Sequence, residues 1–389
     1  MRERLSVMSV FGTRPDTIKM APVVRALQAH PDIDARVCVT AQHRQMLDDL
    51  LGFFAIAPDY DLNIMTEDQS LTEITTRVLI GMEPALRDAR PDVVLVHGDT
   101  TTSSAAALAA FYQRTPVGHV EAGLRTSNPW VPYPEEMNRR LTATLATYHF
   151  APTLLAREHL LAENVPAGDV FVTGNTVIDA FLETAARNDL PVPPRWTQLD
   201  KQRPAIVVTA HRRENHDHMR EICEALRAIA ELPSKPQLYW PVHPSPRVAP
   251  IAHEILGRMP GVVLVDPIDY AEMVAAVRGA AFVLTDSGGL QEEAPCIGKP
   301  VLVMREETER PEGLAAGTIA LVGHDGERIV RTARLLLEDQ AAYAAMAHAR
   351  NPYGDGHAAS RIARWLVARL RGGEYPESFE AQTVAAAPS

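Results

Sequence analysis

Short β-branched runs alternate with longer helical patterns along this chain, and that alternation constrains the fold more than any other feature. In the first half the apolar runs are Leu5 to Val10, Arg36 to Thr40, Val93 to Val96 and Val117 to Val120. Between the second and third runs, apolar residues recur every three or four positions from Leu71 to Met82, which is the period of one helix face. This rhythm is typical of a parallel sheet covered by helices.

A second series of the same kind fills the other half of the chain. Its apolar runs are Ile206 to Val208, Leu238 to Trp240, Val262 to Val265, Phe282 to Leu284 and Val301 to Val303. At about 150 residues per domain, 389 residues also suit two or three domains. We therefore predict an α/β fold of two Rossmann-like domains, whose parallel sheets face a cleft.

Prolines mark the expected boundary between the two domains. Pro191, Pro193, Pro194 and Pro204 resist both helix and sheet and predict a stiff linker over residues 189–204. The N-terminal domain is then 1–188 and the C-terminal domain 205–357. Residues 358–372 predict a last helix that packs on the first domain, and 373–389, which have little to bury, predict a flexible tail.

Charge and cysteine content exclude several classes of function. The net charge of −11 argues against nucleic acid or an anionic membrane as a partner, since both require clustered positive charge. Three cysteines in no CxxC pairing argue against a disulfide framework or a zinc ribbon and favour a reducing compartment. With no secretory segment or apolar run of about 18 residues, we expect a cytoplasmic protein.

The loops after the strands are where we look for chemistry, because doubly wound sheets bind ligands at the carboxyl ends of their strands. Thr285 to Gly289 end a strand and open a helix, where backbone N–H groups can hold a phosphate; an ordinary strand-to-helix turn is the alternative. No GxxxxGK[ST] or GxGxxG motif occurs, so P-loop hydrolysis and nicotinamide chemistry lose their usual support. Arg14, Lys19 and Arg310 are cations in nearby loops, each also explicable as a surface charge.

Three carboxylates of the first half are candidates for proton transfer. Asp99 and Glu121 directly follow apolar strands, where acidic residues point toward the ligand, and carboxylates brought together there acquire pKa values suited to acid–base chemistry. Glu135 is explained equally by the start of a helix.

Histidines offer a further set of candidates. His211 follows an apolar strand and can donate to phosphate, whereas His216 and His218 fit a solvated helix start and no known metal-site spacing. His97, His119 and His149 are more often core or strand-end residues than ligands.

Taken together, these segments resemble the bacterial non-hydrolysing UDP-N-acetylglucosamine 2-epimerases, from about residue 5 to 370. The matching segments are Phe11 to Pro15 with Lys19, Val96 to Thr102, Gly118 to Thr126, Pro134 to Glu136, His211 to Glu214, Thr285 to Pro295, Glu309 to Glu312 and Asn351 to Gly356.

The resemblance implies a glycosyltransferase-B-type fold, a homodimer, and interconversion of UDP-N-acetylglucosamine and UDP-N-acetylmannosamine with no cofactor and no metal. The family's catalytic residues correspond here to Asp99, Glu121, Glu135 and His211. Its nucleotide contacts correspond to Arg14, Lys19, Ser287, Gly288, Gly289, Glu293 and Arg310.

Bacterial members of the family also bind a second UDP-N-acetylglucosamine as an activator. Residues of that site correspond to Gln42, Gln45, Arg212 and His243. The chain departs from the family pattern at Asp68, where some members carry an arginine, and at Ile268 and Met273, which bear on the contacts with uracil.

Three other functions fit the same residues. A type-B glycosyltransferase shares the fold and the nucleotide site but requires an acceptor, and an epimerase of a related UDP-sugar would differ only in its substrate. A nucleotide-sugar-binding regulator would perform no catalysis, yet carboxylates beside a phosphate weaken binding unless they do chemistry.

Overall fold

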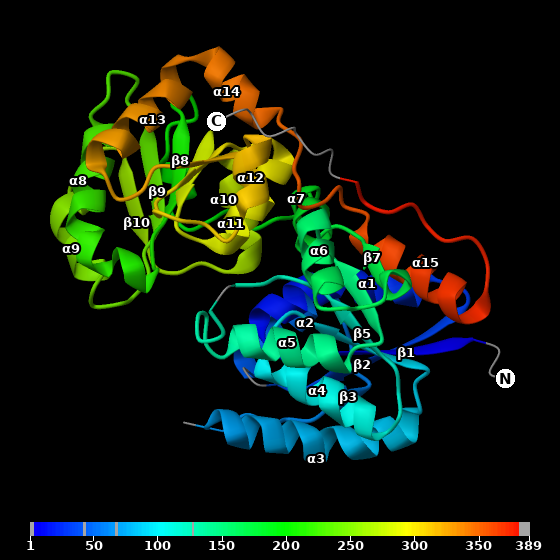
Figure 1. The fold of residues 1–389 in the computed structure, drawn as a ribbon. Helices are drawn as coiled ribbons and strands as arrows, with labels where there is room; N and C mark the ends of the chain where they lie inside the picture. The colour runs from blue at the N-terminus through cyan, green and yellow to red at the C-terminus, as the bar shows by residue number, and fades with distance from the viewer. Residues whose placement is uncertain (1–3, 42–43, 67–68, 127, 381–389) are drawn as a thin grey trace. The chain divides into compact units, whose positions relative to one another are not determined.

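Two compact units make up the structure, a computed structural model that describes residues 4–41, 44–66, 69–126 and 128–380, with backbone alone at 44–46. The first unit comprises 4–180 with 354–380, and the second comprises 181–353 (Figure 1). Over these residues, no helix is both long enough and apolar enough to cross a membrane.

The first unit is built on a parallel sheet whose strands lie in the order β3-β2-β1-β4-β5-β6-β7. These strands are β1 Leu5–Phe11, β2 Ile33–Val39, β3 Tyr60–Asp61, β4 Val93–His97, β5 Val117–Val120, β6 Tyr148–Ala151 and β7 Val170–Val172. Its helical segments are α1 Arg14–Ala29, α2 Arg44–Phe53, α3 Leu71–Ala89, α4 Thr101–Tyr112, α5 Glu135–Leu145, α6 Leu154–Ala162, the 3-10 turn Ala167–Asp169, α7 Thr176–Ala185 and α15 Ala358–Arg371.

The second unit repeats this plan with the strand order β10-β9-β8-β11-β12-β13. Its strands are β8 Ala205–Thr209, β9 Gln237–Pro241, β10 Val262–Val265, β11 Phe282–Thr285, β12 Val301–Val303 and β13 Ile319–Leu321. Its helices are α8 Met219–Ala230, α9 Ala249–Leu256, α10 Tyr270–Gly279, α11 Gly288–Glu293, α12 Pro311–Ala316, α13 Gly326–Glu338 and α14 Gln340–Ala347, with 3-10 turns at Trp196–Gln198, Arg213–His218 and Ala294–Ile297.

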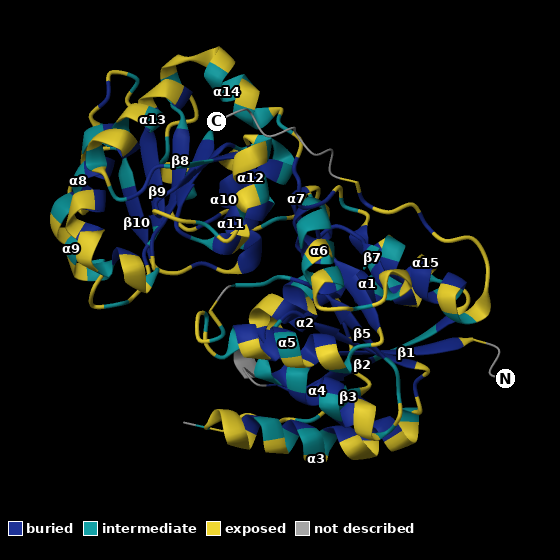
Figure 2. Ribbon diagram, viewed as in Figure 1, coloured by how far each residue is buried: buried dark blue, intermediate teal, exposed yellow. Residues whose placement is uncertain are grey.

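The apolar runs of the sequence form the buried layers of both units (Figure 2). The strand β1 is buried along its whole length, and Ile74, Val78 and Met82 of α3 are buried beneath it while Leu71 is exposed. The helix α3 begins with a capping box in which Ser70 and Glu73 satisfy each other's backbone N–H groups. The predicted α/β class with parallel sheets is confirmed.

Strands β3, β6, β7 and β13 are not predicted by the sequence pattern. Each spans only two to four residues. They extend the two sheets at their edges, where they pair with strands that were predicted or with one another.

The proline-rich segment 189–204 belongs to the second unit and packs on it, whereas its composition predicts a linker. Trp196 contacts Tyr239 with ring centroids 4.9 Å apart, and the Arg195 guanidinium donates to the Leu264 carbonyl at 2.8 Å. The division between the units falls inside α7, after Ala180. The packing of the Trp196 side chain fixes this segment on the second unit. The proline content indicates only that the backbone is stiff and does not reveal this packing.

The C-terminal segment is also ordered by aromatic packing. The helix α15 packs against α1, and its Trp365 lies edge-on to Phe150, with ring centroids 5.3 Å apart. Beyond Gly373, where the composition predicts a flexible tail, Phe379 is buried and its N–H donates to the Val172 carbonyl at 2.9 Å. Burial of Phe379 and hydrogen bonds from Ser378 Oγ to the Val172 carbonyl and from Arg361 Nε to the Glu377 carbonyl hold the described part of this segment, up to residue 380, beside the edge strand β7.

Candidate functional site

Each sheet has one point where the strand order reverses and the connections leave on opposite faces. In the first sheet this point lies between β1 and β4, and in the second between β8 and β11. Ligands of doubly wound folds bind at the carboxyl ends of these strands. The loops there carry Thr13 and Arg14 after β1, Gly98 and Asp99 after β4, His211 and Arg212 after β8, and Asp286 to Gly289 after β11.

Glu121 follows β5 in an uncommon backbone conformation. Its φ is +63°, a left-handed value that is strained for a residue other than glycine. The side chain is buried, pairs with the Lys19 ammonium, and accepts a hydrogen bond from Asn175 Nδ2 at 3.0 Å. Burial acts to raise the pKa of Glu121, but Lys19 and His97 outweigh it and hold that pKa well below its usual value. The carboxylate therefore stays charged.

His97 ends β4 and lies between two carboxylates. Its Nδ1 is 3.1 Å from Asp16 Oδ1 and its Nε2 is 3.7 Å from Glu121 Oε2. Burial by itself lowers the pKa of His97, but Glu121 and Asp16 raise it to about 9. The imidazole is therefore a buried cation at neutral pH, and it supports the charge on Glu121.

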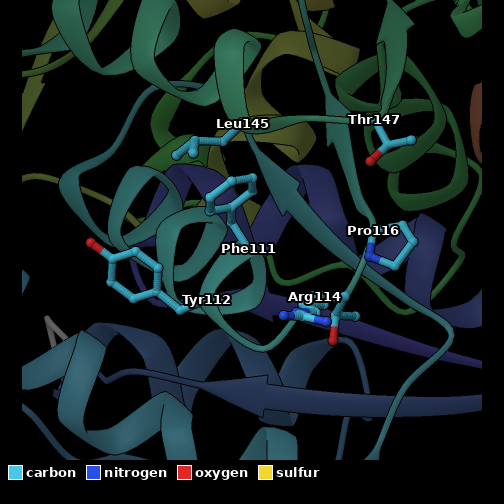
Figure 3. Close-up of a pocket in the computed structure, with 7 residues that line it drawn as sticks. Phe111, Tyr112, Arg114, Pro116, Leu145 and Thr147 are labelled. Atoms are coloured by element: carbon cyan, nitrogen blue, oxygen red, sulfur yellow. The ribbon is translucent and has the colours of Figure 1, made fainter.

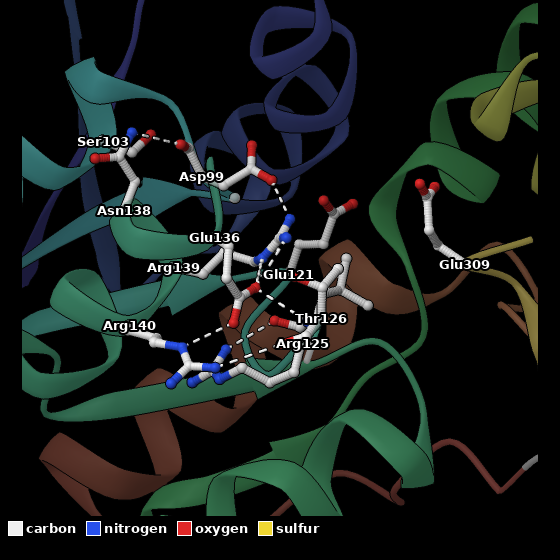
Figure 4. A network of polar contacts seen from close by, with 12 residues as sticks. Asp99, Ser103, Glu121, Arg125, Thr126, Glu136, Asn138, Arg139, Arg140 and Glu309 are labelled. Atoms are coloured by element: carbon white, nitrogen blue, oxygen red, sulfur yellow. Dashed lines mark hydrogen bonds and ion pairs between the residues drawn. The ribbon is translucent and has the colours of Figure 1, made fainter. Parts of the chain in front are cut away.

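Asp99 has different surroundings from Glu121. Arg139 of α5 contacts its carboxylate at 2.6 Å, and Asn138 donates to its backbone carbonyl at 2.9 Å (Figure 4). Burial raises the pKa of Asp99 above its usual value, against the opposing effect of Arg139. Glu121 and Lys19 also act on this pKa, which brings these three predicted residues into one electrostatic neighbourhood.

Glu135 is the first residue of α5, as its helix-start explanation predicts. Its neighbour Glu136 is fully buried and pairs with Arg139 and Arg140, so Glu136 anchors the helix (Figure 4). The Oε2 atom of Glu135 is buried and has no hydrogen-bond partner among the described residues. A buried carboxylate oxygen without a donor is costly, which is consistent with a ligand-binding role for Glu135.

In the second unit, Gly288 opens α11 between two arginines. A Cβ at this position would lie 3.4 Å from Arg212 Nη2 and 3.9 Å from Arg310 Nη2. Arg310 pairs with the buried Glu292, which keeps the guanidinium in place. Two guanidinium groups around a position without a side chain suit a phosphate group.

The other predicted nucleotide contacts differ in how closely they join this position. Ser287 precedes α11, and a Cβ on the exposed Gly289 would meet only Glu293, at 3.6 Å, among the described residues. Arg14 is exposed at the start of α1 in the first unit.

The residues assigned to a separate activator site are only partly described. His243 stacks on His211 with ring centroids 6.0 Å apart, and Arg212 lies beside Gly288, so both belong to the surroundings of the predicted phosphate contacts. Gln42 and Asp68 lie outside the described residues, and so does the side chain of Gln45. Ile268 and Tyr270 are buried, at the loop after β10 and the start of α10. Over the described part of the chain, no cluster of three or more His, Cys, Asp or Glu side chains could hold a metal ion.

Sequence reasoning missed the residues that support the predicted ones. Asp16 contacts His97, and Arg139 contacts Asp99. Asn175 contacts Glu121, and Asp286 contacts His211. Asp286 could have been found from the sequence, because it directly precedes Ser287 in a loop that was already a candidate. The other three supporting residues lie in helices or loops distant in sequence from the residues that they contact.

Comparison with known proteins places the chain in a family. The family described as UDP-N-acetylglucosamine 2-epimerase matches residues 25–367. The UDP-N-acetylglucosamine 2-epimerase of Salmonella typhimurium is 53% identical over 369 residues, covering 93% of this chain and 98% of that protein.

Solved structures extend the likeness to three dimensions. A crystal structure of a UDP-N-acetylglucosamine 2-epimerase shares 48% identity at a TM-score of 0.91, covering 98% of this chain and all of that one. The Neisseria meningitidis enzyme bound to UDP-GlcNAc shares 46% at a TM-score of 0.85, covering 93% of this chain and all of that one. A glycosyltransferase of Streptomyces nogalater, at 15% identity and a TM-score of 0.63 with 95% and 99% of the chains covered, shares the fold alone. The chain belongs to the UDP-N-acetylglucosamine 2-epimerase family and has its glycosyltransferase-B-type α/β fold.

Proposed function

We propose that this protein interconverts UDP-N-acetylglucosamine and UDP-N-acetylmannosamine by inverting carbon C2 of the sugar. The observation that carries this proposal is Glu121, a buried charged carboxylate in a strained conformation with Lys19 and His97 beside it and Asp99 nearby. Strain and a perturbed pKa at one residue are characteristic of reaction sites. The relative from Neisseria meningitidis, crystallised with UDP-GlcNAc, supports the same substrate here.

The chemistry explains why carboxylates are needed. The proton on C2 is not adjacent to a carbonyl, so it becomes removable only as the bond from C1 to the phosphate oxygen breaks and C1 gains positive charge. Anti elimination then leaves UDP and a 2-acetamidoglucal, and re-addition with protonation from the other face gives the epimer. Proton transfer on both faces requires more than one acid–base group.

The two carboxylates suit different parts of this reaction. Glu121, whose pKa is held low, remains an anion that stabilises positive charge at C1. Asp99, whose pKa burial raises, takes and releases a proton more readily near neutral pH. Glu135, with its buried oxygen lacking a described partner, is a third group for proton transfer.

The second unit supplies the nucleotide contacts in this proposal. Arg212 and Arg310 flank Gly288, and His211 is exposed at the end of β8. Positive groups around the phosphates stabilise UDP as it departs, which is where negative charge develops. Ser287, Gly289 and Glu293 extend this contact, while Arg14 and Lys19 are cations of the first unit.

We further propose that the protein acts in the cytoplasm as a homodimer. Cys38, Cys223 and Cys296 are all free thiols, which suits a reducing compartment. Met137 and Leu141 of α5 are exposed one helical turn apart, and α5 packs beside α4. Phe111 and Tyr112 at the end of α4 are exposed and, with Leu145, line a hollow of about 500 Å³ (Figure 3). We propose that these exposed apolar side chains belong to the surface that a second copy covers.

Deuterium incorporation tests the proposed reaction directly. The purified protein is incubated with UDP-N-acetylglucosamine alone in deuterium oxide, and the products are separated and analysed by NMR. We expect UDP-N-acetylmannosamine carrying deuterium at C2, with traces of free UDP and 2-acetamidoglucal.

None of the alternatives gives labelled UDP-N-acetylmannosamine in the same tube. A glycosyltransferase leaves C2 unlabelled and turns over only when an acceptor is added, an epimerase of a related UDP-sugar requires that sugar, and a binding regulator does not turn over. Product that retains protium at C2 contradicts the elimination mechanism, and an absence of any product contradicts the epimerase function.

A further inference from the structure

Asp286 is a buried carboxylate, without a role in the proposed function, that ties the loop after β11 to the loop after β8. It follows β11 and is fully buried. Its Oδ2 accepts hydrogen bonds from the backbone N–H groups of His211 and Arg212 at 2.7 and 2.8 Å, and from Asn215 Nδ2 at 2.9 Å. One oxygen thereby fixes the backbone from which the His211 side chain departs.

The second oxygen of Asp286 faces the imidazole ring itself. His211 Nδ1 lies 3.1 Å from Asp286 Oδ1, within ion-pair distance, and that buried oxygen has no hydrogen-bond partner of standard geometry among the described residues. An ionised carboxylate is an acceptor only, so the proton of a neutral ring is favoured on Nδ1. The His211 side chain as a whole is 40% exposed, and Nε2 is the ring nitrogen that does not face the carboxylate.

Asn215 keeps Asp286 from turning away. Its amide donates to Asp286 and also to the Met304 carbonyl at 3.0 Å, and its Oδ1 lies 2.7 Å from His324 Nε2. The carboxylate, which follows β11, is thus bound to the segment after β8, and Asn215 connects it to Met304 directly after β12. Burial acts to raise the pKa of Asp286, but His211 and the two backbone N–H groups outweigh it and lower that pKa below its usual value.

We propose that Asp286 is the positioning residue of His211: it keeps a proton on Nδ1, aims Nε2 at the phosphate of the substrate, and neutralises the ring when Nε2 is also protonated. The assignment of a phosphate to Nε2 rests on the proposed function. As the bond from C1 to the phosphate oxygen breaks, the electron pair goes to that oxygen. The ring that is protonated on both nitrogens then donates a hydrogen bond from Nε2–H to this oxygen without transferring the proton. A charge-assisted hydrogen bond is about twice as strong as a neutral one.

The ring nitrogens can be read directly by ¹⁵N NMR of histidine-labelled protein, with the His211 signals assigned by their loss in His211→Gln. We expect the neutral His211 ring of the wild-type protein to carry its proton on Nδ1. In Asp286→Asn the amide can retain its oxygen toward the backbone N–H groups and present NH₂ to the ring, so the proton should move to Nε2. A wild-type ring with a bare Nδ1 overturns the proposal, even if the variant does not fold.

Kinetics separate positioning from mere support of the fold. We expect Asp286→Asn to lower kcat by about 10²-fold while KM changes by less than about threefold. In the His211→Gln background, Asp286→Asn should lower kcat by less than about threefold, because the effects of two residues that act as a unit are not additive. Asp325→Asn, at an exposed cap of two backbone N–H groups on α13, is the matched control and should leave kcat unchanged.

The outcomes distinguish this proposal from the proposed function. An equal loss in both backgrounds means that Asp286 acts only on the fold, which contradicts the positioning role. If the wild-type protein shows no epimerase activity, the proposed function fails, whereas the NMR result still decides whether Asp286 sets the protonation of His211.

Discussion

Asp99 and Glu121 follow neighbouring strands of one sheet, yet their surroundings move their pKa values in opposite directions, up for Asp99 and down for Glu121. The difference arises from the charged partners, because Asp99 pairs with Arg139 whereas Glu121 pairs with Lys19 and lies beside His97. Two carboxylates with separated pKa values are suited to separate tasks in one reaction.

Replacing either carboxylate by its amide tests these tasks. We expect Asp99→Asn and Glu121→Gln each to lower kcat by about 10² to 10⁴-fold, because each loses its charge with little change of volume. Steady-state epimerisation rates measure this, with Asp88→Asn, an exposed partner of Tyr60, as the control. A variant within a few-fold of wild type removes that residue from the mechanism.

Stability should distinguish the same two variants. Removing one partner of a buried ion pair costs about 3 to 5 kcal/mol in general. Glu121→Gln leaves the Lys19 ammonium without this carboxylate and leaves the buried His97 with Asp16 as its remaining carboxylate neighbour. We therefore expect a clearly lower Tm for Glu121→Gln than for Asp99→Asn.

His97 predicts a pH-dependent contribution to stability. Its pKa is about 9 in the folded protein and about 6.5 in an unfolded chain, so the folded state binds the proton more tightly. That stabilisation is fully present below about pH 6.5 and is lost as the pH rises through about 9. Denaturant unfolding should show that His97→Gln loses more free energy of unfolding at pH 6 than at pH 9.5.

The control for this experiment is the same pair of measurements on His30→Gln, at the half-buried end of α1 near Asp32. A His97→Gln loss that is equal at pH 6 and pH 9.5 contradicts a buried imidazolium.

At the scale of elements, short loops at the two points of strand-order reversal carry the site. The helix α11 begins directly after β11 with Gly288, whose missing side chain leaves room between Arg212 and Arg310. In the first unit α5 performs the corresponding task, because Asn138 and Arg139 both reach Asp99. Elements thus place the charges, and the glycine provides the space.

Gly288→Ala tests the phosphate position. The added methyl group would lie 3.4 Å from Arg212 Nη2, in the space proposed for phosphate oxygens. We expect calorimetry to show at least about tenfold weaker UDP binding, or about 1.4 kcal/mol. Gly326→Ala, at the first position of α13 with only ordinary contacts, is the matched control and should bind UDP normally. Unchanged affinity in a folded Gly288→Ala protein means that the phosphates bind elsewhere.

At the scale of the whole molecule, the proposed second copy covers the exposed apolar side chains of α4 and α5. Leu141→Glu places a charge in the middle of this face, and burying an unpaired charge is unfavourable. Sedimentation velocity should show a dimer for the wild-type protein and a monomer, or a dimer weakened at least about tenfold, for Leu141→Glu. Val192→Glu, at an exposed apolar residue of the second unit, should remain dimeric.

Local patterns of the sequence determined much of this protein. Alternation of strands and helices predicted two parallel sheets, because a buried strand and a helix face each have their own period. Asp99 and Glu121 could be singled out from position alone, because a charge directly after an apolar strand lies at the sheet edge where ligands bind.

Only the tertiary structure decided how these residues are charged and held. Lys19 and Glu121 are 102 positions apart and His211 and Asp286 are 75 apart, so no local spacing connects them. Contacts distant in sequence also place the two segments that composition predicts as linker and tail. Trp196 packs against Tyr239, and the Phe379 N–H donates to the Val172 carbonyl. A pKa depends on burial and on the charges within a few ångströms, and both are properties of the folded chain, which is why the sequence could name the carboxylates but not assign their separate tasks.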